Sequence, residues 1–192
     1  MFIKDWKKDV FTIPNILSMF RLVLIPVYVV LYLNAAELTD YFLAAAILAV
    51  SCLTDMIDGK IARHFNMIST LGKILDPIAD KATQFTLTLC LSIKYPVLRF
   101  VLALFVIKEL FQGIAGLVNL KKGKMLPGAL IPGKICTMVL FISLILLVLL
   151  PNLSENWINT IAILDTGFLT WSFISYVFAY FGKNIKVQDM EK

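Results

Sequence analysis

The chain has 192 residues, of which 59% are hydrophobic and only 16% are charged. A soluble globular domain is about 45–50% apolar and about 25% charged, so this composition argues against an ordinary soluble protein. The net charge of +5 fits attraction to anionic lipid headgroups, and nothing in the sequence calls for a nucleic-acid partner.

The first residues, MFIKDWKKDVF, place apolar side chains at helical spacing among three lysines. This pattern predicts a short amphipathic helix over residues 1–12 that lies on the membrane surface. The lysines and the apolar stretch after them could also mark a cleaved signal peptide. That stretch is too long for a signal peptide, however, and it contains Arg21 and two prolines, so we expect it to remain as a first membrane span.

Long apolar stretches then follow one another along the chain, and a spanning helix needs about 20 mostly apolar residues. Six stretches qualify: residues 13–33, 41–63, 69–94, 96–119, 130–150 and 157–180. They are too long for barrel strands and lack period-two alternation, so helices must satisfy their backbone hydrogen bonds. We predict an all-α, polytopic integral membrane protein with six transmembrane helices in residues 13–182, and a single domain over residues 1–192.

Lysine and arginine collect on one side of the predicted membrane. They occur in residues 1–12, at the edges of the second loop near residues 60–73, in the loop 121–134 and in the tail after residue 182. The loops on the opposite side are sparse in basic residues. By the positive-inside rule, both termini and the loop between the second and third spans face the cytoplasm, as expected for a multi-pass protein of the inner (cytoplasmic) membrane.

Four aspartates interrupt this apolar sequence in TDMIDGKIARHFNMISTLGKILDPIADK, residues 54–81. Asp55 and Asp58 are three residues apart, and Asp76 and Asp80 are four apart, so each pair shares one face of a helix. A short turn joins the two helices, which predicts that the four carboxylates converge near the membrane surface.

Charges in a spanning segment are costly, so cations must neutralise this cluster. Lysines could do so in a structural salt-bridge network, and Lys60, Lys73 and Lys81 are near in sequence. Lysine pairing does not explain why Gly59 and Gly72 lie on the same faces. Two divalent ions such as Mg²⁺, which prefer carboxylate oxygens, would cancel four charges and leave positions for phosphate oxygens. The glycines would let a bulky ligand approach the backbone.

The pattern Asp55-x2-Asp58-Gly59-x2-Ala62-Arg63-x8-Gly72-x3-Asp76-x3-Asp80 resembles, at every fixed position, the motif of the CDP-alcohol phosphatidyltransferases. The stretch IPNILSMFRLVLIP (13–26) is similar to the first span of the phosphatidylglycerophosphate synthase branch. The resemblance implies a CDP-diacylglycerol donor, frequent homodimers and a site that binds two Mg²⁺ ions, with Mn²⁺ as the alternative. It implies metal ligands at Asp55, Asp58, Asp76 and Asp80, with Asp80 as the catalytic general base.

The same resemblance implies donor contacts at Gly59, Ala62, Arg63 and Gly72. Arg63 suits a phosphate oxygen because its planar fork matches that geometry, although it could instead anchor the helix at the headgroups. Arg21 in the first span, with Asn15 one and a half turns earlier, is expected to point toward the aspartates and to contribute to donor binding. The alternative is that Arg21 extends to the headgroups.

The acceptor is implied by basic residues in later spans. Lys108-Glu109 lies inside the fourth span, where the phosphatidylglycerophosphate synthases carry Arg-Glu and another arginine seven residues further on. This chain has Gly116 at that second position. The Gly-Lys-x-Lys-Thr of those enzymes appears here as GKICT (133–137), with Lys134 retained and one lysine lost.

A small phosphorylated alcohol, with glycerol 3-phosphate first, would bind Lys108, Lys134 and Arg63. The two missing basic residues leave room for phosphatidylglycerol, as in cardiolipin synthesis, for another polyol, or for inositol phosphate. A different class of protein, an ion-coupled transporter, would show inverted repeats and polar residues near mid-membrane. No repeat is visible and the aspartates crowd one end of two helices, which argues against a transporter. We therefore favour the activity that the resemblance implies, a transferase of phospholipid biosynthesis that releases CMP.

Overall fold

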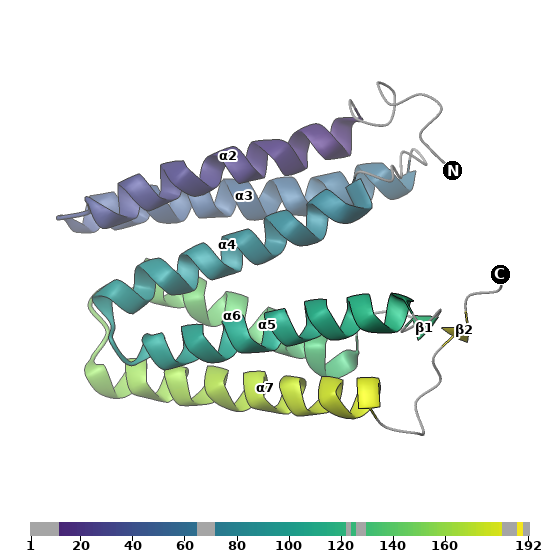
Figure 1. Ribbon diagram of the computed structural model, residues 1–192. Coiled ribbons are helices and arrows are strands. Elements are labelled where there is room, and N and C mark those ends of the chain that lie inside the picture. The colour runs from purple at the N-terminus through teal and green to yellow at the C-terminus, as the bar shows by residue number, and fades with distance from the viewer. Residues whose placement is uncertain (1–11, 65–71, 122–123, 126–129, 182–187, 190–192) are drawn as a thin grey trace. The chain divides into compact units, whose positions relative to one another are not determined.

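The computed structural model describes residues 12–64, 72–121, 124–125, 130–181 and 188–189. The interfacial helix that the sequence predicts over residues 1–12 therefore lies, except for Thr12, outside the described residues. Six helices occur in the described part (Figure 1): α2 (Ile13–Leu33), α3 (Leu38–His64), α4 (Gly72–Lys94), α5 (Leu98–Lys121), α6 (Ile131–Leu149) and α7 (Glu155–Phe181). Two short strands, β1 (Lys124–Met125) and β2 (Gln188–Asp189), complete it, and the predicted all-α class is confirmed.

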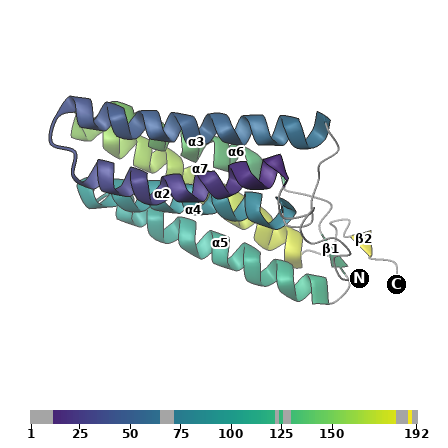
Figure 2. The same ribbon diagram turned by 90° about the horizontal axis from the view of Figure 1, so that it is seen from above.

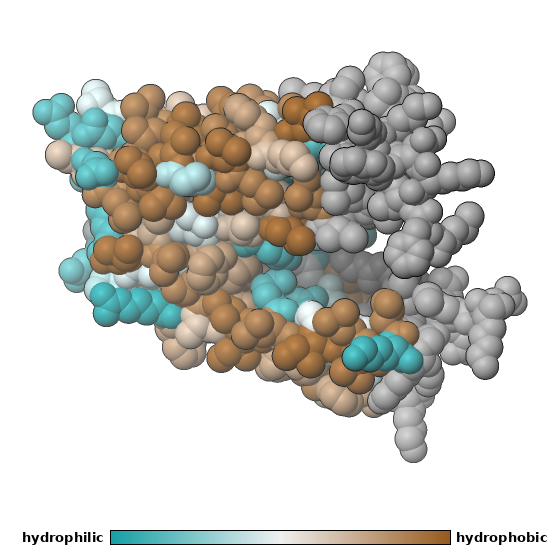
Figure 3. Space-filling model, turned by 45° about the horizontal axis from the view of Figure 1, so that its top comes forward, coloured by the Kyte–Doolittle hydropathy of each residue, from teal (hydrophilic) through white to brown (hydrophobic). Residues whose placement is uncertain are grey.

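Four of these helices, α2, α5, α6 and α7, are long and apolar enough to cross a membrane. Helices α3 and α4 have 27 and 23 residues, which at 1.5 Å per residue is roughly 40 and 35 Å, but both carry aspartates. Hydrophobic residues cover most of the face seen in Figure 3. Large apolar side chains are exposed along α5: Phe100, Ile107, Leu110, Ile114 and Leu117. An apolar surface of this extent marks membrane contact, so the chain is a multi-pass membrane protein.

The chain divides into two compact units, and the first contains α2, α3 and α4 as far as Cys90, together with Val148–Pro151. Helices α2 and α3 lie side by side and are joined by residues 34–37 (Figures 1 and 2). The carboxylate of Asp40 accepts hydrogen bonds from the backbone N–H groups of Glu37 at 3.0 Å and Ala36 at 2.9 Å, which caps the start of α3. These two bonds hold the pKa of Asp40 below its usual value.

Aromatic rings pack against one another near the connection between α2 and α3. The rings of Tyr28 and Tyr32 stack at 5.6 Å, and Tyr32 meets Tyr41 edge-on at 5.7 Å. At the other end of this unit, the first turns of α2 and α4 lie together with the last turns of α3 (right in Figures 1 and 2). The helix segments that carry the aspartates therefore share one end of the unit.

The second unit covers Leu91–Leu147 and Asn152–Lys192 and contains α5, most of α6, α7 and both strands. Helices α5 and α7 pack together, with the ring of Phe111 edge-on to Phe173 at 5.2 Å. Strands β1 and β2 pair antiparallel, with Lys124 opposite Asp189. This pairing joins β2, which follows α7, to β1, which lies between α5 and α6.

Candidate functional site

Helix α4 presents three of the predicted site residues on consecutive turns. Gly72, Asp76 and Asp80 are spaced by four, so the helix places them on one face, as the sequence predicted. Gly72 is buried, Asp76 is half-buried, and the side chain of Asp80 is 52% exposed. The stripe thus runs from a buried glycine to a carboxylate that a ligand can reach.

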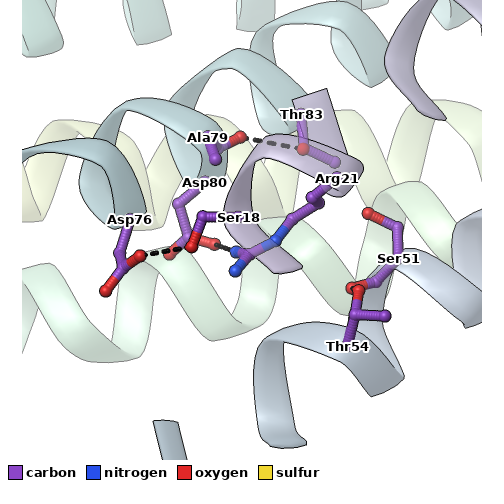
Figure 4. A network of polar contacts seen from close by, with 8 residues as sticks. All are labelled: Ser18, Arg21, Ser51, Thr54, Asp76, Ala79, Asp80 and Thr83. Atoms are coloured by element: carbon purple, nitrogen blue, oxygen red, sulfur yellow. Dashed lines mark hydrogen bonds and ion pairs between the residues drawn. The ribbon is translucent and has the colours of Figure 1, made fainter. Parts of the chain in front are cut away.

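Helix α2 contributes hydrogen-bond donors to both carboxylates (Figure 4). The hydroxyl group of Ser18 donates to Oδ1 of Asp76 at 2.5 Å, and Nη1 of Arg21 donates to Oδ1 of Asp80 at 3.2 Å. Asn15, three residues before Ser18, is buried as well. A polar stripe on α2 therefore faces the acidic stripe on α4.

Arg21 is 2% exposed, so it does not extend to the headgroups as the alternative interpretation had it. A guanidinium group stays charged at any physiological pH, so burial requires a compensating negative charge. Asp80 supplies that charge through the ion pair at 3.2 Å. The expectation that Arg21 points toward the aspartates agrees with this contact.

The remaining predicted ligands lie in the last turns of α3. Helix α3 extends to His64, so its backbone includes Asp55 and Asp58, and the side chains of five predicted site residues fall outside the described part: Asp55, Asp58, Gly59, Ala62 and Arg63. Just before them, the hydroxyl group of Thr54 donates to the carbonyl oxygen of Ser51 at 2.7 Å (Figure 4). Helix α3 continues without a break into the aspartate segment.

The described carboxylates fit part of a divalent-cation site. Asp76 and Asp80 offer carboxylate oxygens on adjacent turns at the accessible end of α4, and such oxygens are the ligands that Mg²⁺ and Mn²⁺ prefer. No group of three His, Cys, Asp or Glu side chains that could hold a metal ion occurs in the described part of the chain, which does not include the aspartate side chains near the end of α3. Two of the four predicted ligands, Asp76 and Asp80, thus share one face of α4.

Two of the three predicted acceptor residues, Lys108 and Lys134, belong to the second unit, whereas Arg63 belongs to the first. Lys108 is buried in α5, and its Nζ donates to Oε1 of Glu109 at 2.7 Å. Lys134 is exposed in the first turn of α6, directly after the buried Gly133. A Cβ atom at Gly133 would lie 2.5 Å from the Oη atom of Tyr176, so the glycine allows that ring to pack against the start of α6.

Two polar residues of the structure were missed by the sequence analysis. Ser18 donates to a predicted metal ligand, and its signal was the spacing of Asn15, Ser18 and Arg21, which repeats every three residues within an apolar span. Asp165 lies in α7 with its side chain buried, and it is an aspartate inside a predicted span. An ionisable residue at such a position is itself a signal.

Comparison with known proteins gives a family match along most of the chain. Residues 11–174 match the family model described as CDP-alcohol phosphatidyltransferase. A candidate cardiolipin synthase from Mycobacterium tuberculosis is 32% identical over 172 residues, which is 89% of this chain and 80% of that protein.

Two further relatives match over shorter regions. The CDP-diacylglycerol–glycerol-3-phosphate 3-phosphatidyltransferase of Escherichia coli K12 is 41% identical over 71 residues, 37% of this chain and 38% of that protein. A fusion protein of Schizosaccharomyces pombe, with a CMP-forming cardiolipin synthase part and a mitochondrial hydrolase part, is 39% identical over 89 residues. Those residues are 46% of this chain and only 14% of the fusion protein.

Proposed function

Since the chain belongs to the CDP-alcohol phosphatidyltransferase family, and is therefore a membrane enzyme of phospholipid biosynthesis, we propose that it transfers the phosphatidyl group of CDP-diacylglycerol to glycerol 3-phosphate and releases CMP. One observation carries the proposal. The carboxylates of Asp76 and Asp80 lie one turn apart at one end of α4, and each is held by a donor from α2. Carboxylates fixed in this way are suited to bind divalent ions and to accept a proton.

In the proposed reaction, a hydroxyl oxygen of the acceptor attacks the lipid-linked phosphorus of CDP-diacylglycerol. A new O–P bond forms while the bond from that phosphorus to the CMP oxygen breaks, and the hydroxyl proton passes to Asp80. Asp80 suits this role because its carboxylate is half exposed and its Oδ1 atom is held by Arg21, which fixes the direction of the second oxygen. Two divalent ions at Asp55, Asp58, Asp76 and Asp80 would supply charge stabilisation for the diphosphate.

Donor binding is assigned to residues at the same end of the first unit. We place the diphosphate near Gly59, Ala62, Arg63 and Gly72, because residues without large side chains admit it and the fork of Arg63 matches phosphate oxygens. Gly72 lies one turn before Asp76 on the same face of α4, and it adds no side chain beside that carboxylate. Asn15 and Arg21 serve the donor from α2, with Arg21 acting through its contact with Asp80.

Acceptor binding is assigned to Lys108, Lys134 and Arg63, whose charges would attract the phosphate of glycerol 3-phosphate. A second candidate acceptor, phosphatidylglycerol, is favoured by two observations. The chain has Gly116 and Cys136 at the two positions where the phosphatidylglycerophosphate synthases carry basic residues. The candidate cardiolipin synthase of Mycobacterium tuberculosis aligns over 89% of the chain. A phosphodiester carries one negative charge and a phosphomonoester nearly two, so fewer cations suffice for phosphatidylglycerol.

We further propose that residues 13–182 act as one membrane domain in the cytoplasmic membrane, as a homodimer, with both termini and the aspartates on the cytoplasmic side. The family match includes residues of both compact units, which supports a single functional domain. The distribution of lysine and arginine among the loops supports the orientation.

The proposed function is tested with purified protein in detergent that receives Mg²⁺, CDP-diacylglycerol and one acceptor at a time. Glycerol 3-phosphate, phosphatidylglycerol and inositol phosphate are the acceptors to compare, and CMP release is the readout. We expect CMP release that depends on the acceptor. Asp76→Asn should abolish it because the charge of a metal ligand is lost, and Asp80→Asn should abolish it because the general base is lost. Thr88→Val, which removes a buried hydroxyl group elsewhere on α4, should keep most of the activity. Near-normal activity of either aspartate variant would overturn the assignment.

Removal of divalent ions provides a separate test of the ligand set. We expect EDTA to stop CMP release completely and added Mg²⁺ or Mn²⁺ to restore it, because four clustered carboxylates repel a diphosphate unless cations neutralise them. The rate is measured before chelation, after chelation and after each metal is returned. Full activity in EDTA would contradict the role assigned to the four aspartates.

A further inference from the structure

The polar stripe of α2 and the acidic stripe of α4 are in register. Ser18 and Arg21 are three residues apart, Asp76 and Asp80 are four apart, and each α2 donor meets the carboxylate on the corresponding turn of α4. The two helices therefore run in the same direction along this contact. Both donors are almost fully buried, whereas the carboxylates that they hold are partly exposed.

The hydrogen bond of Ser18 to Asp76 differs from those of five other hydroxyl groups in the described helices. The hydroxyl groups of Thr83, Thr88, Thr160, Thr170 and Ser175 each donate to the carbonyl oxygen four residues earlier in their own helix. That local bond is the ordinary way for serine and threonine to be satisfied in a helix. Ser18 instead donates to the carboxylate of Asp76, 58 residues away in the sequence.

From this register and these contacts we propose that α2 is the positioning element of the cation site, with Ser18 and Arg21 orienting the carboxylates of Asp76 and Asp80. The proposal rests on the function proposed above, because it takes those two aspartates as metal ligands. Ser18 holds one oxygen of Asp76 and so fixes the rotation of that carboxylate. Arg21 does the same for Asp80 and also supplies a fixed positive charge beside it.

Residues that hydrogen-bond to a metal ligand, as Ser18 and Arg21 do here, contribute to metal affinity without touching the metal. A carboxylate that is already oriented loses less rotational freedom when it binds an ion, and a lost outer partner commonly weakens metal binding by about 10–100-fold. Ser18 is neutral, so its removal changes no charge at the site. A change in metal affinity on its removal therefore reports orientation.

The test is the affinity of the purified protein for Mn²⁺ alone, measured by the electron paramagnetic resonance signal of free Mn²⁺, with neither donor nor acceptor present. We expect Ser18→Ala to raise the dissociation constant about 10-fold. Thr88→Val is the matched control, because Thr88 is also 0% exposed, belongs to the same compact unit and loses a hydroxyl group that donates only to the Gln84 carbonyl among the bonds described. The control should bind Mn²⁺ as the unmodified protein does.

A double-mutant comparison separates positioning from general loosening of the fold. In an Asp76→Asn background, Ser18→Ala should have no further effect on Mn²⁺ affinity, because the carboxylate that it orients is gone. Thermal unfolding in EDTA shows whether the variants fold alike without metal. If Ser18→Ala does not fold, Ser18→Cys replaces it, since a thiol keeps the shape but donates weakly, and we expect it to raise the dissociation constant as well.

The inference is overturned if a folded Ser18 variant binds Mn²⁺ as tightly as the unmodified protein. It is also overturned if Ser18→Ala weakens Mn²⁺ binding by the same factor in the Asp76→Asn background as in the unmodified protein. Failure of the proposed function looks different. It would appear as unmodified protein that binds Mn²⁺ but releases no CMP with any acceptor, while Ser18→Ala still weakens Mn²⁺ binding.

Discussion

The buried charged side chains described in α2, α5 and α7 are of two kinds. Arg21 and Lys108 are both almost fully buried, and each has a carboxylate partner, Asp80 and Glu109 respectively. Asp165 in α7 is equally buried, but neither of its carboxylate oxygens has a hydrogen-bond partner among the described residues, although Ser143 of α6 is near enough to interact. The paired cations follow the usual rule for charges within a membrane protein, and Asp165 departs from it.

The departure predicts a stability cost at Asp165. Burying a polar group without a hydrogen bond costs about 1–3 kcal/mol in proteins, so Asp165→Val should raise the free energy of unfolding by about 1 kcal/mol. Ala162→Val is the control, because it adds the same side chain one turn away on the same buried face of α7, where extra volume destabilises. Thermal unfolding in detergent compares the two variants. A fall in the melting temperature of Asp165→Val as large as that of the control would contradict this account.

At the scale of an element, the start of α6 depends on a side chain of α7. The Oη atom of Tyr176 accepts a hydrogen bond from the backbone N–H of Leu130 at 3.2 Å, and its ring packs against Gly133. This contact fixes the first turn of α6, in which Lys134 directly follows Gly133. A larger residue at position 133 would have to displace a buried ring.

Gly133→Ala is therefore expected to destabilise the protein by about 1–3 kcal/mol, since overpacking forces the Tyr176 ring and the Leu130 bond to shift. Gly113→Ala in α5 is the matched control, because a Cβ atom there meets nothing within 4 Å and alanine favours helix by about 0.5–1 kcal/mol. Urea unfolding in mild detergent measures both variants. Equal stability of the two alanine variants would show that the Tyr176 contact is unimportant.

The elements that could be predicted from the sequence are those with a local cause. Long apolar runs predicted the helices, and the spacing of Gly72, Asp76 and Asp80 predicted one face of α4. Strands β1 and β2 have two residues each, too few for any alternation to appear in the sequence. The spacing of Asn15, Ser18 and Arg21 marks a polar face on α2, but it does not identify Asp76, 58 residues away, as the partner of Ser18.

At the scale of the whole molecule, the surroundings of the protein follow from its composition more than from any single motif. The apolar fraction of 59% and the exposed apolar face of α5 require a lipid surrounding, whereas the four clustered aspartates lie at one end of α3 and α4. The side of the membrane at which that end lies is a separate question. It depends on the loops, where lysine and arginine resist translocation.

The proposed orientation predicts which cysteines a membrane-impermeant maleimide can reach. Glu37→Cys lies in the exposed turn between α2 and α3, at the opposite end of these helices from the aspartate segments, so intact cells should label it from outside. Lys192→Cys should be labelled only after the cells are permeabilised, because basic residues of the tail keep it in the cytoplasm. The background carries Cys52→Ala, since Cys52 is partly exposed whereas Cys90 and Cys136 are buried, and this background alone should remain unlabelled. Labelling of position 192 but not of position 37 in intact cells would place the aspartates outside, away from any cytoplasmic supply of CDP-activated lipid.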